Sequence, residues 1–215
     1  TIPMLPDILQ HLEMLVSFDT RNPPRVIDTG GIFDYLQAKL PDFSCTVTDH
    51  GAGAVSLLAV RGAPTRVFNV HLDTVPSSEA WSADPLKLRI ANGSAVGLGA
   101  CDIKGAAAGL IVAAERTSGD AAFLFSSDEE ANDARCIGAF LASDHGFCEA
   151  IIAEPTQCEA VLAHRGIGSV LMTFRGAAGH ASGANAMHSS ALHHAMRWGA
   201  KALDLVEAES HRRFG

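Results

Sequence analysis

Three apolar runs in this sequence, at residues 67–70, 121–125 and 150–153, are each followed by side chains that can bind a metal ion or move a proton. These side chains are His71, Asp73, Asp128, Glu129, Glu130 and Glu154. Imidazole and carboxylate groups without thiolates form a nitrogen and oxygen donor set that suits a hard or borderline divalent ion. A hydrolytic metal centre is therefore the first chemistry that the sequence indicates.

His71 and Asp73 have the spacing of two residues on the same face of a strand. The imidazole and the carboxylate can share one site, with Asp73 either binding the metal ion or orienting the ring. A buried hydrogen-bonded pair without a metal ion explains the same two residues equally well. Only the neighbouring residues can decide between these interpretations.

Asp128, Glu129 and Glu130 are three successive carboxylates. Such a run is usually a solvated turn, but this one directly follows an apolar segment, where like charges raise one another's pKa unless a cation lies among them. Adjacent side chains point in different directions. One carboxylate can therefore bind a metal ion while its neighbour stays free as a general base.

Asp102 lies in the sequence GLGACDIKG, at the start of a predicted helix. It has two simpler explanations, as the N-cap of that helix or as part of a nucleotide-binding loop. The loop lacks the third glycine of a dinucleotide site and the GK[ST] of a phosphate loop. His180 lies in a glycine-rich loop and is by default an ordinary loop residue. No GxSxG motif supports a serine nucleophile.

The amino-acid composition excludes some classes of binding partner. The 215 residues include 24 acidic and 16 basic side chains, for a net charge of −8, so no basic surface for nucleic acid or anionic lipid is expected. No apolar run approaches the roughly 18 residues of a membrane helix. Five cysteines without a CxxC pair fit the reducing cytoplasm. A small molecule is the expected partner.

The elements that must position these side chains alternate between helices and strands. Periodicity predicts helices at 4–18, 29–40, 103–116 and 134–143, and strands at 45–49, 54–60, 65–71, 86–90, 121–126 and 150–153. This order predicts an α/β fold, with a mostly parallel sheet, helices on both faces and a site at the carboxyl ends of strands.

The pattern changes after residue 158. Strands are predicted at 160–164 and 167–175, followed by one long helix at 186–211. We therefore expect a catalytic metal-binding domain at 1–164 and the start of a smaller α+β lid domain at 165–215, which looks incomplete.

Five motifs resemble, in sequence order, one family of enzymes. The motifs are HLDTVP at 71–76, GLGACDIKG at 97–105, SSDEEAND at 126–133, AEPT at 153–156 and GAAGHAS at 176–182. The family is that of the dinuclear zinc amidohydrolases and peptidases, which include acetylornithine deacetylase, succinyl-diaminopimelate desuccinylase, aminoacylase and related carboxypeptidases. The resemblance implies a metallopeptidase-like catalytic domain that binds Zn²⁺ or Co²⁺.

The resemblance also implies roles for individual residues. His71 and Glu154 would bind one metal ion, Glu130 would bind the other, and Asp102 would bridge both. Asp73 would fix the His71 ring, and Glu129 would be the general base. The peptide bond between Asp102 and Ile103 would be cis, as it tends to be in the family.

His180 matches a histidine of the lid domain that stabilises the oxyanion in relatives, often across a homodimer formed by that domain. A last metal-binding histidine of the family has no match in this sequence, so either sequence is missing or the protein holds one metal ion.

Within the family, the sequence looks most similar to the acetylornithine deacetylase branch and its acetylcitrulline-specific members. Cleavage of N-acetyl-L-citrulline or N-acetyl-L-ornithine in arginine biosynthesis is the implied reaction. The alternatives are a dipeptidase or carboxypeptidase, and a non-catalytic relative or fragment.

Overall fold

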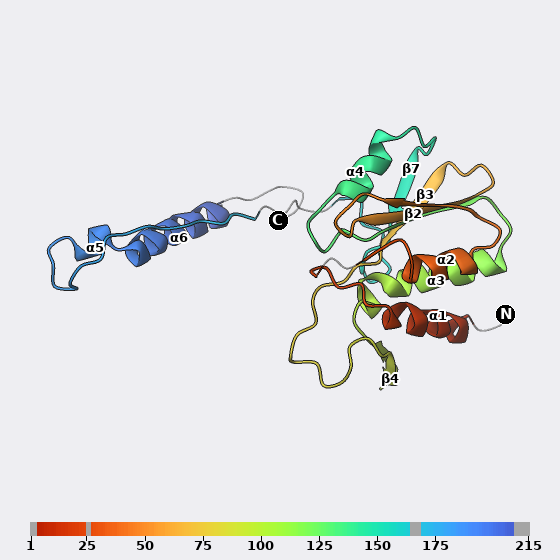
Figure 1. The fold of residues 1–215 in the computed structure, drawn as a ribbon, viewed down its shortest axis with the longest axis horizontal. Helices are drawn as coiled ribbons and strands as arrows, with labels where there is room; N and C mark the ends of the chain where they lie inside the picture. Colours follow the sequence, from red (N-terminus) through yellow and green to blue (C-terminus); the bar gives the residue numbers. More distant parts are fainter. Residues whose placement is uncertain (1–3, 25–26, 164–168, 209–215) are drawn as a thin grey trace. The chain divides into compact units, whose positions relative to one another are not determined.

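The computed structural model describes residues 4–24, 27–163 and 169–208. It forms two compact units, Thr1–Cys158 and Glu159–Gly215, each of which is described by itself (Figure 1). The expected domain boundary between residues 164 and 165 lies outside the described residues.

The first unit is built on a five-stranded sheet with the order β1-β2-β6-β3-β7. Its strands are β1 (Ser44–Asp49), β2 (Val55–Arg61), β3 (Arg66–His71), β6 (Ala121–Ser126) and β7 (Glu149–Ile152). β2 is antiparallel to both of its neighbours, whereas β3 is parallel to β6 and to β7. Four of the five strands therefore run in one direction, and the predicted mostly parallel sheet is confirmed.

The central strands β3 and β6 place the functional side chains side by side. Their register pairs His71 with Ser126, and the backbone N–H of Leu72 donates to the Ser126 carbonyl over 2.7 Å. Both strands are buried over most of their lengths, which explains their apolar composition. The segment after β3 and the turn after β6 consequently leave the sheet at the same edge.

Helices cover both faces of the sheet, as predicted. α1 (Leu5–Ser17), α2 (Ile32–Lys39) and α3 (Gly105–Arg116) lie on one face, and α4 (Arg135–Ala142) lies on the other (Figure 1). α3 buries Ala107, Ala108 and Ile111 completely, and α1 buries Leu15 and Val16. Residues of α1 and α3 belong to the same core cluster, in which the α3 alanines are small enough to be buried completely.

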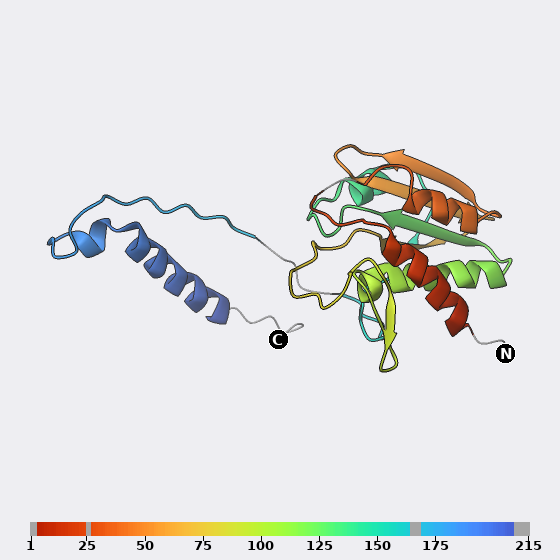
Figure 2. The ribbon, with the colours of Figure 1, turned by 60° about the horizontal axis from the view of Figure 1, so that its bottom comes forward.

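A short hairpin extends from the first unit (Figure 2). Its strands are β4 (Arg89–Ala91) and β5 (Ser94–Val96), and the turn residues Asn92 and Gly93 both have positive φ, as a type I′ hairpin turn requires. The strand predicted at 86–90 is therefore wrong at 86–88. Asp84 is the cause, because its carboxylate accepts the Leu86 N–H and its carbonyl accepts the Lys87 N–H, which form a turn instead.

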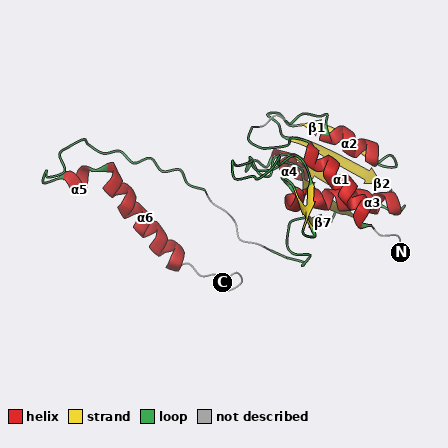
Figure 3. Ribbon diagram, turned by 90° about the horizontal axis from the view of Figure 1, so that it is seen from below, coloured by secondary structure: helices red, strands yellow, loops and turns green. Residues whose placement is uncertain are grey.

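The second unit differs from its prediction. Its described residues contain α5 (Ala186–Ser189), α6 (Ala191–Ala208) and an extended loop, with no strand at 160–163 or 169–175 (Figure 3). A strand needs a partner for its backbone hydrogen bonds, and the described part of this unit offers none. The predicted long helix is also broken at Ser190, whose extended ψ of 128° separates α5 from α6. Residues 209–211 of that prediction lie outside the described residues.

Among the described helices, none combines the length and the apolar character that crossing a membrane requires.

Candidate metal centre

His71 ends β3 with its side chain only 3% exposed. Its Nδ1 lies 3.1 Å from the backbone carbonyl oxygen of Asp73. A carbonyl can only accept, so Nδ1 must carry the hydrogen and donate. The lone pair of the neutral ring is thereby assigned to Nε2.

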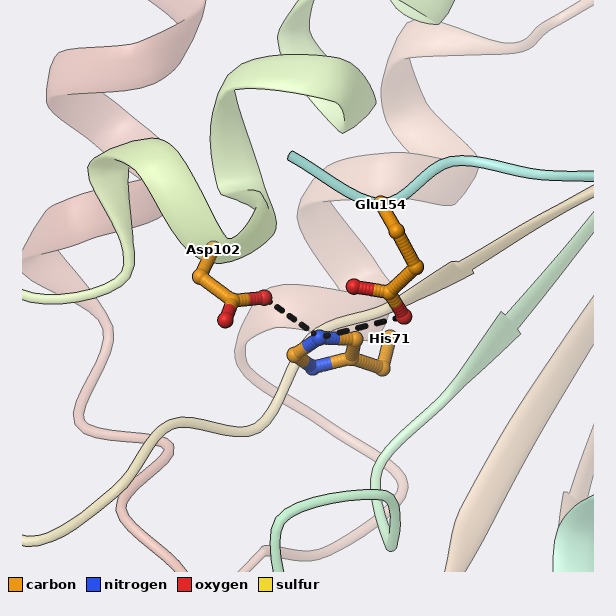
Figure 4. A group of neighbouring side chains, drawn as sticks. All are labelled: His71, Asp102 and Glu154. Atoms are coloured by element: carbon orange, nitrogen blue, oxygen red, sulfur yellow. Dashed lines mark hydrogen bonds and ion pairs between the residues drawn. The ribbon is translucent and has the colours of Figure 1, made fainter. Parts of the chain in front are cut away.

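Two carboxylates face Nε2 of His71. The distance from Nε2 to Asp102 Oδ1 is 2.9 Å and the distance to Glu154 Oε1 is 4.0 Å (Figure 4). The ligand atoms of these three residues all lie within 4.8 Å of one another. Since a lone pair and two carboxylates repel one another, this arrangement requires a proton or a metal ion between them. The donor set therefore fits a divalent metal ion.

The carboxylates around His71 raise the pKa of its ring. Burial lowers this pKa, but hydrogen bonds to Asp73 and Asp102 and the negative charge of Glu154 outweigh the burial and raise it to about 9. The metal-free ring is therefore an imidazolium at neutral pH. A metal ion at this position takes the place of the Nε2 proton.

Asp102 is positioned by the irregular turn η1 (Ala100–Lys104) between a glycine loop and α3. Its peptide bond to Ile103 is cis, as expected from the resemblance. Gly99, at φ +73°, has no room for a side chain, because a Cβ there would lie 2.5 Å from the methyl group of Thr74. The alternative that Asp102 caps α3 is wrong, since Lys104 occupies the N-cap position and Asp102 faces His71.

Asp73 lies behind the His71 ring and is completely buried. One carboxylate oxygen is 3.5 Å from His71 Nδ1. The carboxylate also accepts the backbone N–H groups of Glu129 and Glu130 over 3.3 and 2.9 Å. Asp73 thus joins the end of β3 to the turn after β6, a geometry that fits an orienting residue.

The three successive carboxylates of that turn have different environments. Asp128 is buried and accepts the N–H of Cys136 in the first turn of α4, so it belongs to the scaffold. Glu129 is exposed and Glu130 is half-buried. Burial, together with the charges of Asp102 and Glu129, raises the pKa of Glu130. Glu130 therefore shares the negative field of the centre, although the group of three close ligand atoms does not include it.

His180 lies in an exposed loop of the second unit. Its Nδ1 accepts the backbone N–H of Ser182 over 3.3 Å and lies 2.7 Å from the Ser182 hydroxyl. This bond leaves the hydrogen of the neutral ring on Nε2. The catalytic role of His180 stays a prediction.

Sequence reasoning missed three buried polar residues beside the centre. Thr20 donates from Oγ1 to the Leu72 carbonyl over 2.7 Å, and Asn22 donates to Asp73 and to the Ser127 carbonyl. Lys104 is 1% exposed and donates to the Phe18 carbonyl over 3.0 Å. Burial lowers its pKa to about 8, although the charges of Asp19 and Asp73 act in the opposite direction. In the sequence, the two prolines that follow Asn22 indicate only a break between helices.

The sequence is similar to those of known proteins. The chain is 65% identical over 213 residues to N-acetyl-L-citrulline deacetylase from Xanthomonas campestris, a match that covers 99% of this chain and 58% of that protein. It is 32% identical over 168 residues to succinyl-diaminopimelate desuccinylase from Wolinella succinogenes, covering 73% of this chain and 44% of that protein. The chain thus spans about half the length of these curated relatives.

The fold is similar to that of human carnosine dipeptidase 1, with a TM-score of 0.55 and 21% sequence identity over 69% of this chain and 38% of that one. At this identity the likeness concerns the fold alone. A family model described as peptidase family M20/M25/M40 matches residues 67–210, a range that contains every predicted site residue from His71 to His180. The chain belongs to peptidase family M20/M25/M40.

Proposed function

We propose that this protein is a metal-dependent hydrolase that removes the acetyl group from an N-acetyl amino acid. We propose N-acetyl-L-citrulline as the substrate, with N-acetyl-L-ornithine as the alternative. The observation that carries this proposal is the 65% identity to N-acetyl-L-citrulline deacetylase over almost the whole chain. The acidic cluster around His71 supplies the matching chemistry.

Zn²⁺ or Co²⁺ fits the donor set of the centre. His71, Asp102 and Glu154 would hold one ion, and Glu130 would hold a second that shares Asp102. A bound ion would supply a lowered pKa for water and a positive charge opposite the developing oxyanion. The negative charge that Asp102 and Glu154 place beside Nε2 of His71 supports this assignment, because it attracts a cation.

Glu129 is the proposed general base. Its backbone N–H is bound by the buried Asp73 while its side chain is exposed at the tip of the turn, so a fixed backbone presents a solvent-accessible carboxylate. The carboxylate takes a proton from the attacking water and passes it to the amine nitrogen as the carbon–nitrogen bond breaks. The products are acetate and the free amino acid.

His180 is proposed to donate from Nε2 to the oxygen of the acetyl group, where negative charge develops. Its tautomer, set by the Ser182 N–H, supports this role. Following the resemblance to the family, we further propose that the second unit is part of a lid that forms a homodimer. We place the reaction in arginine biosynthesis. We place the protein in the cytoplasm, a proposal that the five free cysteines support, because thiols stay reduced there.

The test is an initial-rate assay of N-acetyl-L-citrulline beside N-acetyl-L-ornithine and a dipeptide, on protein stripped with a chelator and titrated with Zn²⁺ or Co²⁺. Glu129→Ala should lower kcat by about 10² to 10⁴-fold, the usual contribution of a general base. Glu13→Ala, which removes an exposed carboxylate of α1, is the matched control and should leave kcat unchanged.

Cleavage of the dipeptide with both acetylated substrates intact would overturn the substrate assignment. Equal activities of Glu129→Ala and Glu13→Ala would overturn the mechanism.

A further inference from the structure

Asn22 connects three segments that meet behind the metal centre. Its side-chain Nδ2 donates to Asp73 Oδ2 over 3.3 Å and to the Ser127 carbonyl over 3.1 Å, and its backbone N–H donates to the Thr74 carbonyl over 2.8 Å. These partners lie in the segment after β3 and in the turn that carries Glu129 and Glu130. One residue of the N-terminal loop therefore holds both segments.

The orientation of the Asn22 amide is fixed by its partners. Both groups that face Nδ2 are acceptors, so rotating the amide by half a turn would place Oδ1 against a carboxylate and a carbonyl. In the observed orientation, Oδ1 is buried without a hydrogen-bond partner, and Asn22 is only 1% exposed. A buried unsatisfied acceptor is unfavourable, so packing alone does not explain an asparagine here.

The two hydrogen bonds that the Asn22 amide donates connect it to the metal centre. Asp73 receives one of them and lies 3.5 Å from Nδ1 of His71. The other fixes the Ser127 carbonyl, directly before the turn whose N–H groups also bind Asp73. A shift of Asp73 would move its backbone carbonyl, which accepts the Nδ1 hydrogen of His71, as well as its carboxylate. The His71 ring would then turn, and with it the Nε2 atom that faces Asp102 and Glu154.

We propose that Asn22 is a positioning residue of the metal centre, which acts through Asp73 to fix the His71 ring. This inference rests on the proposed metal-dependent function. Residues that orient metal ligands typically contribute 10 to 100-fold to metal affinity. Because Asn22 is one contact further from the metal ligand than Asp73, its effect should lie near about tenfold.

The chain offers a matched control in the same loop. Thr20 is 3% exposed and also donates one buried hydrogen bond to the segment after β3, but its acceptor is the Leu72 carbonyl rather than Asp73. Thr20→Val removes this bond at nearly constant volume. It therefore measures the effect of loosening the loop without touching the Asp73 carboxylate.

The experiment measures Co²⁺ binding to the purified metal-free protein by competition with a chromophoric chelator, together with the visible absorption bands of the bound Co²⁺. Asn22→Ala should weaken Co²⁺ binding about tenfold and shift the bands. Thr20→Val should change the affinity by less than about twofold and leave the bands in place. In an Asp73→Asn background, Asn22→Ala should add less than about twofold.

Equal losses in Asn22→Ala and Thr20→Val, or a full tenfold loss that persists in Asp73→Asn, would overturn the positioning role. If Asn22→Ala does not fold, Asn22→Ser, which keeps one donor, takes its place with an intermediate loss expected. Wild-type protein that binds no Co²⁺ would overturn the proposed function and this inference together. Wild-type protein that binds Co²⁺ and deacetylates, with Asn22→Ala equal to Thr20→Val, would overturn the inference alone.

Discussion

The two units of this chain differ in how far their apolar side chains are buried. In the first unit, large side chains such as Phe33, Leu57 and Phe125 are completely buried between the sheet and the helices. In the second, no described residue is buried, and the apolar side chains of α6 remain exposed, including Leu203, Leu205 and Val206 at 63–70%. Both units contain amphipathic helices, so the difference lies in whether an element covers the apolar face.

This difference determines where function can be assembled. His71, Asp102 and Glu154 come from three separate segments of the first unit, namely the end of β3, the turn η1 and the loop after β7. Only a packed sheet and helix layer can hold such side chains within a few ångströms. An uncovered helix of 18 residues is marginally stable by itself. Metal binding is therefore expected to depend on the first unit.

The largest expected difference between the units is in core packing. Phe125→Ala removes a fully buried ring at the centre of the sheet and should lower the free energy of unfolding by about 3 to 5 kcal/mol. Leu205→Ala removes an exposed side chain of α6 and should change it by less than about 0.5 kcal/mol. Urea denaturation followed by circular dichroism measures both. Similar losses in the two variants would show that α6 is packed in solution.

A smaller difference is expected in how pH affects metal binding. The pKa of His71 is raised to about 9 in the metal-free protein, and a metal ion binds only the neutral ring. Apparent Co²⁺ affinity should therefore rise about tenfold per pH unit below pH 9 and level off above it. An unperturbed histidine would give a curve that levels off near pH 6.5.

Titrations of Co²⁺ at several pH values between 6 and 8.5 test this prediction. Asp73→Asn is the control, because it removes one of the charges that raise the His71 pKa and should move the levelling point to lower pH. An affinity that is already constant between pH 7 and 8.5 in the wild-type protein would show that the carboxylates do not hold a proton on His71.

The sequence predicted the first unit well because its patterns and its packing agree. Alternating and continuous apolar runs identified β2, β3 and β6, and His71 lies at the carboxyl end of β3 as the apolar run before it predicts. The hairpin was displaced because the side chain and carbonyl of Asp84 form a local turn that competes with strand pairing.

The parts of the site that the sequence did not predict depend on contacts between distant segments. Asn22 and Asp73 are 51 residues apart, and nothing near Asn22 in the sequence shows that its amide faces a buried carboxylate. The prediction of strands in the second unit was wrong for a related reason. Alternation of apolar and polar residues specifies a strand only when a partner strand completes its hydrogen bonds.

The smallest expected effect concerns the break between α5 and α6. Ser190 precedes α6, and its hydroxyl accepts the N–H of His193 over 3.4 Å, which is the bond of an N-cap residue. Ser190→Ala should cost about 1 kcal/mol of local helix stability. Because α6 has no buried residue, this loss should appear as faster hydrogen exchange in the first turn of α6, with the unfolding midpoint of the first unit unchanged.

Ser190→Thr keeps the hydroxyl and is the control. A lower unfolding midpoint for Ser190→Ala alone would mean that the two units unfold together, because a local loss can reach the first unit only through shared packing.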